Sequence, residues 1–96
     1  MKRVILKNLD NEKFILKRPI PVTIQSEMVN GYRQYTTWNG WLQVYGVGCT
    51  ESGAIQDIKK SIVELYIDVM KEPIQCLGKD TIRWLKYLNR HVRKVE

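Results

Sequence analysis

The sequence predicts an α+β protein: a three-stranded antiparallel β-meander packed against one helix, followed by a second, C-terminal amphipathic helix. Two Asn-Gly pairs, Asn30-Gly31 and Asn39-Gly40, separate three runs rich in β-branched and aromatic residues. Asn-Gly favours the two-residue type I′ turn of a hairpin, because both of its central residues need a positive φ. Apolar residues at helical spacing then recur twice in the second half of the chain. For 96 residues we expect one domain, with the meander over residues 20–48.

Residues 1–18 form a basic segment that contains two short apolar runs, Val4 to Leu6 and Phe14 to Leu16. A turn-like cluster of Asn and Asp separates the runs, which predicts a short hairpin ahead of the meander. Pro19 and Pro21 then interrupt regular structure, because proline lacks an amide donor. The first meander strand is expected after them.

Two helices are predicted after the meander. The first covers residues 52–71, where Thr50 or Ser52 can cap the N-terminus and apolar residues recur at steps of three and four. These core positions are Ala54, Ile55, Ile58, Ile62, Leu65 and Val69. Pro73 ends this helix. The second helix is predicted over residues 80–93, and its apolar side consists of Thr81, Trp84, Leu85, Leu88 and Val92.

The formal net charge of +6 is unevenly distributed along the chain. Residues 1–18 and residues 79–96 each carry six basic and two acidic side chains, whereas the middle carries four basic and six acidic ones. Basic ends favour contact with phosphates or with an acidic partner, although a solvated surface is the more frequent role of a single charge run. No apolar stretch reaches the roughly 20 residues of a membrane-spanning helix. We expect a cytoplasmic protein without membrane contact.

The chain offers little that supports catalysis or cofactor binding. Cys49, Cys76 and His91 are its only Cys and His residues, one short of the four ligands that a structural zinc site takes. Cys49 precedes a helix, but nothing in the sequence places a base beside it. Gly46 and Gly48 lack the third glycine of a dinucleotide-binding loop, since its position is acidic. We therefore predict no enzyme, metal or cofactor, and leave open whether either thiol is reactive.

The last helix carries the sharpest candidate for a binding site. Its cations recur at steps of three or four, a pattern that suits a phosphate backbone, an acidic protein or plain solvation. The predicted nucleic-acid contacts are Lys79, Arg83, Lys86, Arg90 and Arg93.

Aromatic residues form the candidate surface for a partner. Trp38 and Trp41 stand on either side of the second Asn-Gly pair with tyrosines nearby, a pattern that cross-strand packing also explains. Large aromatics suit a protein interface, and they suit base stacking in single-stranded nucleic acid as well. The predicted partner contacts are Trp38, Trp41, Tyr45, Tyr66 and Ile67.

A family resemblance extends these expectations. After the meander come a small-residue turn that ends in Thr50 and a helix of the pattern A-I-x-x-I-K-x-S-I-x-E-L-Y. This arrangement, over roughly residues 20–72, resembles the HicB-like antitoxin family. Gly53 replaces the family's usual capping-box Glu, so a weaker helix start is expected. The corresponding positions are Thr50, Ala54, Ile58, Ile62, Glu64, Leu65 and Tyr66.

The resemblance implies a non-enzymatic, partial ribonuclease-H-like fold that pairs with a toxin, often an RNA-cleaving one, and often binds operator DNA. The ribonuclease-H carboxylates have no counterpart, because Glu27 is the only acidic residue of the predicted strands. A chain this short buries a modest core, so a homodimer is expected as well. The leading hypothesis is an antitoxin-like regulator that sequesters a toxin and contacts DNA through its last helix. The alternative is a free-standing protein that binds DNA or RNA without a toxin.

Overall fold

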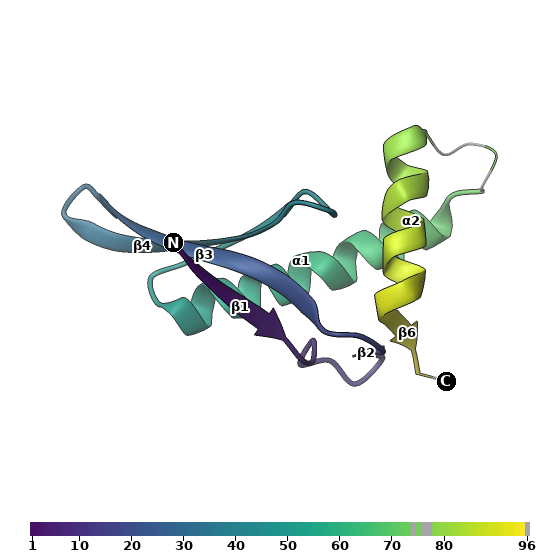
Figure 1. Cartoon of the computed structure of the whole chain (residues 1–96), viewed down its shortest axis with the longest axis horizontal. Helices are drawn as coiled ribbons and strands as arrows, with labels where there is room; N and C mark the ends of the chain where they lie inside the picture. The colour runs from purple at the N-terminus through teal and green to yellow at the C-terminus, as the bar shows by residue number, and fades with distance from the viewer. Residues whose placement is uncertain (74, 76–77, 96) are drawn as a thin grey trace.

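A computed structural model describes residues 1–73, 75 and 78–95. It shows an antiparallel sheet of four strands, a long helix along one face of that sheet, and a second helix at one end (Figure 1). The predicted α+β class is therefore confirmed. In chain order the elements are β1 (Lys2–Leu6), β2 (Phe14–Leu16), β3 (Ile20–Val29), β4 (Tyr32–Asn39), β5 (Val44–Gly48), α1 (Glu51–Lys71), α2 (Lys79–His91) and β6 (Val92–Lys94).

The sheet contains the predicted meander and one additional strand. Its order is β1-β3-β4-β5, with β1 antiparallel to β3 from Lys2↔Ile24 to Leu6↔Ile20. The predicted N-terminal hairpin is wrong, because β1 pairs with β3 whereas β2 pairs with β6 at the other end of the chain. Pro21 lies inside β3, not before it. It is tolerated there because β4 pairs with β3 only from Thr23 onward.

The two Asn-Gly pairs form different connections. Asn30 and Gly31 have φ values of 52° and 84° and join β3 to β4 as the predicted two-residue turn. Asn39, in contrast, pairs with Val44, so that residues 40–43 form a four-residue loop in place of the predicted two-residue turn, and β5 begins at Val44. The prediction fails there because the Asn39 side chain is buried and its Oδ1 accepts the Leu42 amide at 2.8 Å, which folds the loop.

Helix α1 packs directly on β5. Its N-terminus is capped as predicted, since the Gly53 amide donates to Thr50 Oγ1 at 2.9 Å. The core stripe is buried at Ala54, Ile58 and Ile62, which are fully enclosed. Gly46 permits this contact, because a Cβ at that position would lie 2.3 Å from the Ala54 carbonyl oxygen.

Helix α2 is anchored through Leu88, which is fully buried. The helix ends at His91, two residues before the predicted end, and the chain continues as β6. Val92 is buried as predicted, but it is extended and pairs with Leu16 of β2. The periodicity could not reveal this, because Val92 continues the apolar side of the helix and fills the first position of a buried strand equally well.

Candidate nucleic-acid interface

The face of the sheet opposite α1 is open to solvent, and one row of side chains crosses it. The strand register places Arg3 opposite Thr23, Thr23 opposite Trp38, and Trp38 opposite Tyr45. The rings of Trp38 and Tyr45 are tilted against each other with centroids 4.5 Å apart. Tyr45 remains 60% exposed, so this ring pair faces solvent.

A second set of rings lies where the 40–43 loop meets α2. Trp41 stacks on Tyr87 with centroids 6.2 Å apart and planes 17° apart. Tyr87 in turn stacks on His91 at 4.0 Å and 14°. Tyr87 is buried, whereas Trp41 is 61% exposed. The three rings form a rigid shelf with its outermost ring in solvent.

Asn39 fastens this shelf to the sheet. Its side chain is 2% exposed and lies between β3, the 40–43 loop and α2. Nδ2 donates to the Pro21 carbonyl at 2.9 Å and, more weakly, to the Tyr87 hydroxyl at 3.5 Å, while Oδ1 accepts the Leu42 amide. The orientation of α2 relative to the sheet is therefore fixed in part by one amide side chain.

Three adjoining depressions connect the sheet row, the shelf and α2. The first lies over the sheet between Thr23, Trp38 and Tyr45. The second shares Thr23 and Trp38 with the first and reaches Trp41 and Arg83. The third shares Trp41 and Arg83 with the second and follows α2. We call this surface the aromatic-basic groove, whose rings and cations are Trp38, Trp41, Tyr45, Tyr87, His91, Arg3, Arg83, Lys86 and Arg90.

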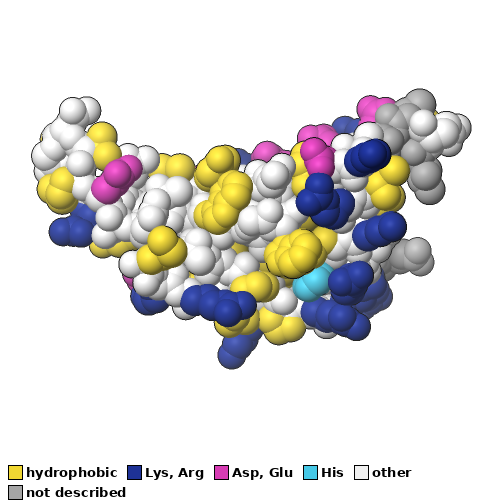
Figure 2. All heavy atoms as spheres, turned by 45° about the horizontal axis from the view of Figure 1, so that its top comes forward, with side chains coloured by type: hydrophobic (Ala, Val, Ile, Leu, Met, Phe, Trp, Pro, Cys, Tyr) yellow, Lys and Arg dark blue, Asp and Glu magenta, His cyan; other side chains and the backbone are white. Residues whose placement is uncertain are grey.

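Lys and Arg side chains line two of the three depressions of the groove, those that reach Trp41 and α2. Among the residues that the structure describes, none that lines it is Asp or Glu. Arg83 forms an ion pair with Asp80, and both side chains are more than half exposed, so solvent screens this pair. Within the described part of the chain, Lys86 and Arg90 have no ion pair. Figure 2 shows hydrophobic side chains over the sheet and, beside them, Lys and Arg side chains gathered near α2.

The predicted nucleic-acid contacts are divided by the structure. Arg83, Lys86 and Arg90 line the groove. Lys79 is exposed at the first residue of α2 and does not line it. The placement of Arg93 on the last helix is wrong, because Arg93 lies on β6 opposite Ile15, beyond the helix end.

The predicted partner contacts are divided as well. Trp38, Trp41 and Tyr45 lie together in the groove. Tyr66 and Ile67 belong to α1, which covers the other face of the sheet, and the Tyr66 ring packs edge-on against Phe14 with centroids 5.3 Å apart. These two residues therefore do not belong to the surface of the three aromatics.

Sequence reasoning did not identify Arg3, Tyr87 and His91 as groove residues. Tyr87 and His91 are four residues apart on a helix, so their stacking was readable as an i,i+4 aromatic pair. Arg3 and Val4 are neighbours in β1 and therefore point to opposite faces of the sheet. Only the pairing of β1 with β3, which the sequence does not indicate, places Arg3 opposite Thr23 and beside Trp38.

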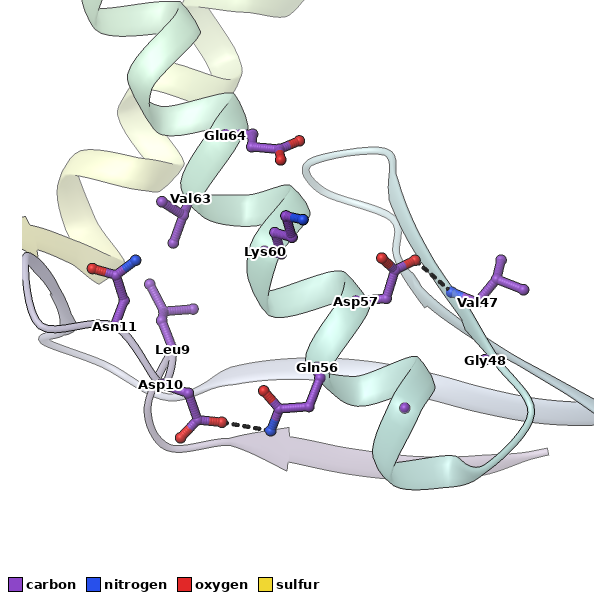
Figure 3. A pocket seen from close by; sticks show the side chains of 11 residues that line it. Leu9, Asp10, Asn11, Val47, Gly48, Gln56, Asp57, Lys60, Val63 and Glu64 are labelled. Atoms are coloured by element: carbon purple, nitrogen blue, oxygen red, sulfur yellow. Dashed lines mark hydrogen bonds between the residues drawn. The ribbon is translucent and has the colours of Figure 1, made fainter.

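A separate depression beside α1 has a structural role (Figure 3). The largely buried Lys59 side chain donates to Asp10 at 2.7 Å and to Asn8 at 3.0 Å, and Gln56 also donates to Asp10. The Lys59 hydrogen bond, followed by that from Gln56, lowers the pKa of Asp10. Asp57 accepts the Val47 amide at 2.9 Å. These contacts fasten the loop after β1, and the edge of β5, to α1.

Among the described residues, the thiol of Cys49 and the possible metal ligands do not form a site. Cys49 is a free, exposed thiol, and Cys76 lies outside the described residues. In the described ranges, no three His, Cys, Asp or Glu side chains are grouped to hold a metal. None of the described helices has the length and hydrophobicity of a membrane-spanning segment. No known protein family, curated protein or solved structure matches the chain.

Proposed function

We propose that the protein binds nucleic acid through the aromatic-basic groove, without catalysing a reaction. The observation that carries this proposal is the continuity of exposed rings and cations along one surface whose described lining has no carboxylate. Aromatic rings stack on bases, and Lys and Arg neutralise phosphates. The groove offers both kinds of contact side by side.

The conformation of Trp41 supports a binding role over a merely solvated surface. Its loop is held by the buried Asn39 and is therefore not free to fold the ring inward. A fixed loop that keeps Trp41 61% exposed holds apolar surface in water, which is unfavourable. A ligand that covers the ring would remove this surface from water and so gain binding free energy.

A salt titration tests the proposal. The four groove cations, Arg3, Arg83, Lys86 and Arg90, can neutralise up to four phosphates. At about 0.7 per phosphate for single strands, we expect a slope of roughly −2.8 in log K against log salt, and so a roughly 50-fold loss between 50 and 200 mM salt. Fluorescence anisotropy with labelled DNA and RNA oligonucleotides measures this slope. Absence of binding at 50 mM salt would contradict the proposal.

A pair of matched variants separates the groove from general positive charge. The double substitution Lys86→Gln, Arg90→Gln removes two groove cations, and we expect the salt slope to fall to roughly −1.4. The control Lys60→Gln, Lys71→Gln removes two exposed cations of α1 and lowers the net charge equally. The control should bind like the wild type. Equal weakening in both variants would assign the binding to net charge.

We also propose a second candidate, the antitoxin-like regulator that the family resemblance implies. The observation that favours it is an exposed apolar pair outside the groove, at the tip of the β3–β4 hairpin, where Val29 and Tyr32 lie opposite each other and are 38% and 78% exposed. A toxin partner encoded beside this chain should form a stoichiometric complex with it that suppresses RNA cleavage. Tyr32→Ala should weaken that complex and leave oligonucleotide binding unchanged. If the chain suppressed RNA cleavage without forming a complex with the toxin, it would not act by sequestering the toxin.

A further inference from the structure

We infer that the ligand of the aromatic-basic groove is a single-stranded nucleic acid, not a duplex. This inference rests on the proposed function and specifies its ligand. It follows from two features of the groove: the cations lie in a depression instead of on a ridge, and exposed ring faces lie beside them.

The position of the cations disfavours a duplex. A helix that reads the major groove of DNA projects its side chains outward into that groove. In this protein Lys86 and Arg90 line a depression together with Pro21 and Trp41, which belong to the sheet and the 40–43 loop. A rigid duplex would meet the exposed Trp41 side chain, whereas the flexible backbone of a single strand can follow a depression.

The rings supply what only a single strand can use. Trp41 is offset-stacked against Tyr87, with centroids 6.2 Å apart, and the residue is 61% exposed, so much of its ring surface is available to a base. The Trp38–Tyr45 pair offers a second platform over the sheet. In a duplex the base faces are stacked on one another, so these rings would gain nothing without unpairing the bases.

The order of residues along the groove indicates a path for the strand. From Tyr45 the surface crosses Trp38 to Trp41 and then follows α2 past Arg83 to Arg90. Bases on the two ring platforms would leave the phosphates that follow beside the cations of α2. Comparable single-strand surfaces take about four or more nucleotides, so oligonucleotides of about 12 suffice to fill this one.

The test compares one labelled 12-mer, as single-stranded RNA, as single-stranded DNA and as a blunt duplex, at a fixed low salt concentration. We expect each single strand to bind at least about tenfold more tightly than the duplex and to quench tryptophan fluorescence. Trp41→Ala should weaken single-strand binding by about 5- to 150-fold, the range that loss of one stacking contact produces, while Trp41→Phe should retain most of it. Because Trp41 is mostly exposed, both variants should fold, which circular dichroism can verify.

The control and the outcomes separate this inference from the proposed function. Tyr32→Ala removes a ring that is more exposed than Trp41, at the hairpin tip and outside the groove, and should bind single strands like the wild type. If the duplex binds as tightly as the single strands and Trp41→Ala changes nothing, while the Lys86→Gln, Arg90→Gln variant weakens both, the groove binds phosphates only. The single-strand inference would then be overturned and the proposed function would stand. If no form binds even at low salt, the proposed function fails first.

Discussion

The buried side-chain amide of Asn39 connects β3, the 40–43 loop and α2, which are distant from one another in the sequence. Asn39→Ala should lower the free energy of unfolding by about 2–4 kcal/mol, because the Leu42 amide and the Pro21 carbonyl would lose their buried partner. Urea denaturation measures the change. Asn89→Ala, at an exposed position of α2, is the control and should stay within about 0.5 kcal/mol. If Asn39→Ala were as stable as the wild type, the Asn39 side chain would not hold these parts together.

Asp10 should make stability depend on acid. Hydrogen bonds from Lys59 and Gln56 hold the pKa of Asp10 below its usual 3.8. A carboxyl whose pKa is lowered by folding contributes stability above pH 3.8, and that contribution is lost as pH falls through the lower value of the folded state. Asp10→Asn should therefore be less stable than the wild type at pH 6, and the difference should shrink at lower pH.

Urea denaturation of both proteins at a series of pH values between 6 and about 2.5 checks this dependence. Asp68→Asn, on the exposed side of α1, is a matched control that removes a carboxyl without a described hydrogen-bond partner. Its difference from the wild type should not follow the same pH course. If the difference in free energy of unfolding between Asp10→Asn and the wild type were the same at every pH, folding would not lower the pKa of Asp10.

Single residues were also where the sequence was hardest to interpret. Asn39 belongs to an Asn-Gly pair, and local chemistry favours a two-residue turn for it as strongly as for Asn30. The two asparagines differ because Asn39 is buried and Asn30 is not. Asn39 has the Pro21 carbonyl and Tyr87 within hydrogen-bond reach, whereas Asn30 is at an exposed tip. Neither neighbour is close in sequence, so no local pattern could indicate it.

Between elements, β5 and α1 lie so close at Gly46 that no side chain fits there. Gly46→Ala should destabilise the protein by about 3 kcal/mol or more, because the new Cβ would lie 2.3 Å from the Ala54 carbonyl oxygen and 2.4 Å from the Ile58 amide nitrogen. The helix would have to move off the sheet. Thermal and urea denaturation measure the loss, with soluble expression as the readout if the variant does not fold.

Gly40→Ala is the matched control for that substitution. At Gly40 a Cβ would meet no atom nearer than Trp38 Nε1 at 3.5 Å, which is ordinary contact. We expect a change below about 1 kcal/mol. If both glycine variants were equally destabilised, the close packing of β5 on α1 would not be the cause.

Elements with strong local patterns could be predicted, and short elements with distant partners could not. The meander, the long helix and the basic helix follow from alternation, capping and helical spacing within continuous stretches. β2 and β6 have three residues each, and their ladder joins Phe14–Leu16 to Val92–Lys94 across most of the chain. Three residues carry too little pattern to specify a partner so far away.

Across the whole molecule, the end of the β3–β4 hairpin has the fewest neighbours. β1 pairs with β3 only as far as Ile24, and β5 pairs with β4 only from Tyr35, so residues 27–34 pair only with each other. This end of the hairpin extends past the first turn of α1 (Figure 1). A two-stranded ribbon is marginally stable in water. Its amides should exchange hydrogen roughly 100-fold faster than those of Ile20–Ile24.

Hydrogen exchange measured by NMR at several protein concentrations checks this prediction. The homodimer predicted from the short length of the chain stays a prediction, and sedimentation equilibrium on the same samples tests it. If the hairpin tip were as protected as the centre of the sheet, and more so at higher concentration, a second copy would be covering it. Exchange that is slow at every concentration would contradict the marginal stability of the tip.

The candidate site could be predicted in its parts but not in its assembly. The sequence predicts two separate surfaces, with Trp38, Trp41 and Tyr45 facing a protein partner and Arg83, Lys86 and Arg90 facing nucleic acid. They form one groove because Leu88 and Asn39 fix α2 against the end of the sheet. Such an arrangement depends on contacts between distant segments, and neither periodicity nor composition encodes it.

The β2–β6 ladder has a consequence for the time course of folding. It closes the loop between Leu16 and Val92, and the lost chain entropy costs roughly 4 kcal/mol. The β3–β4 turn, in contrast, closes over only two residues and costs much less. Contacts near in sequence form earlier than distant ones. We therefore expect the meander and α1 to assemble first and α2 to dock last. Since α2 is one wall of the groove, the chain acquires a complete binding surface only in its final folding step.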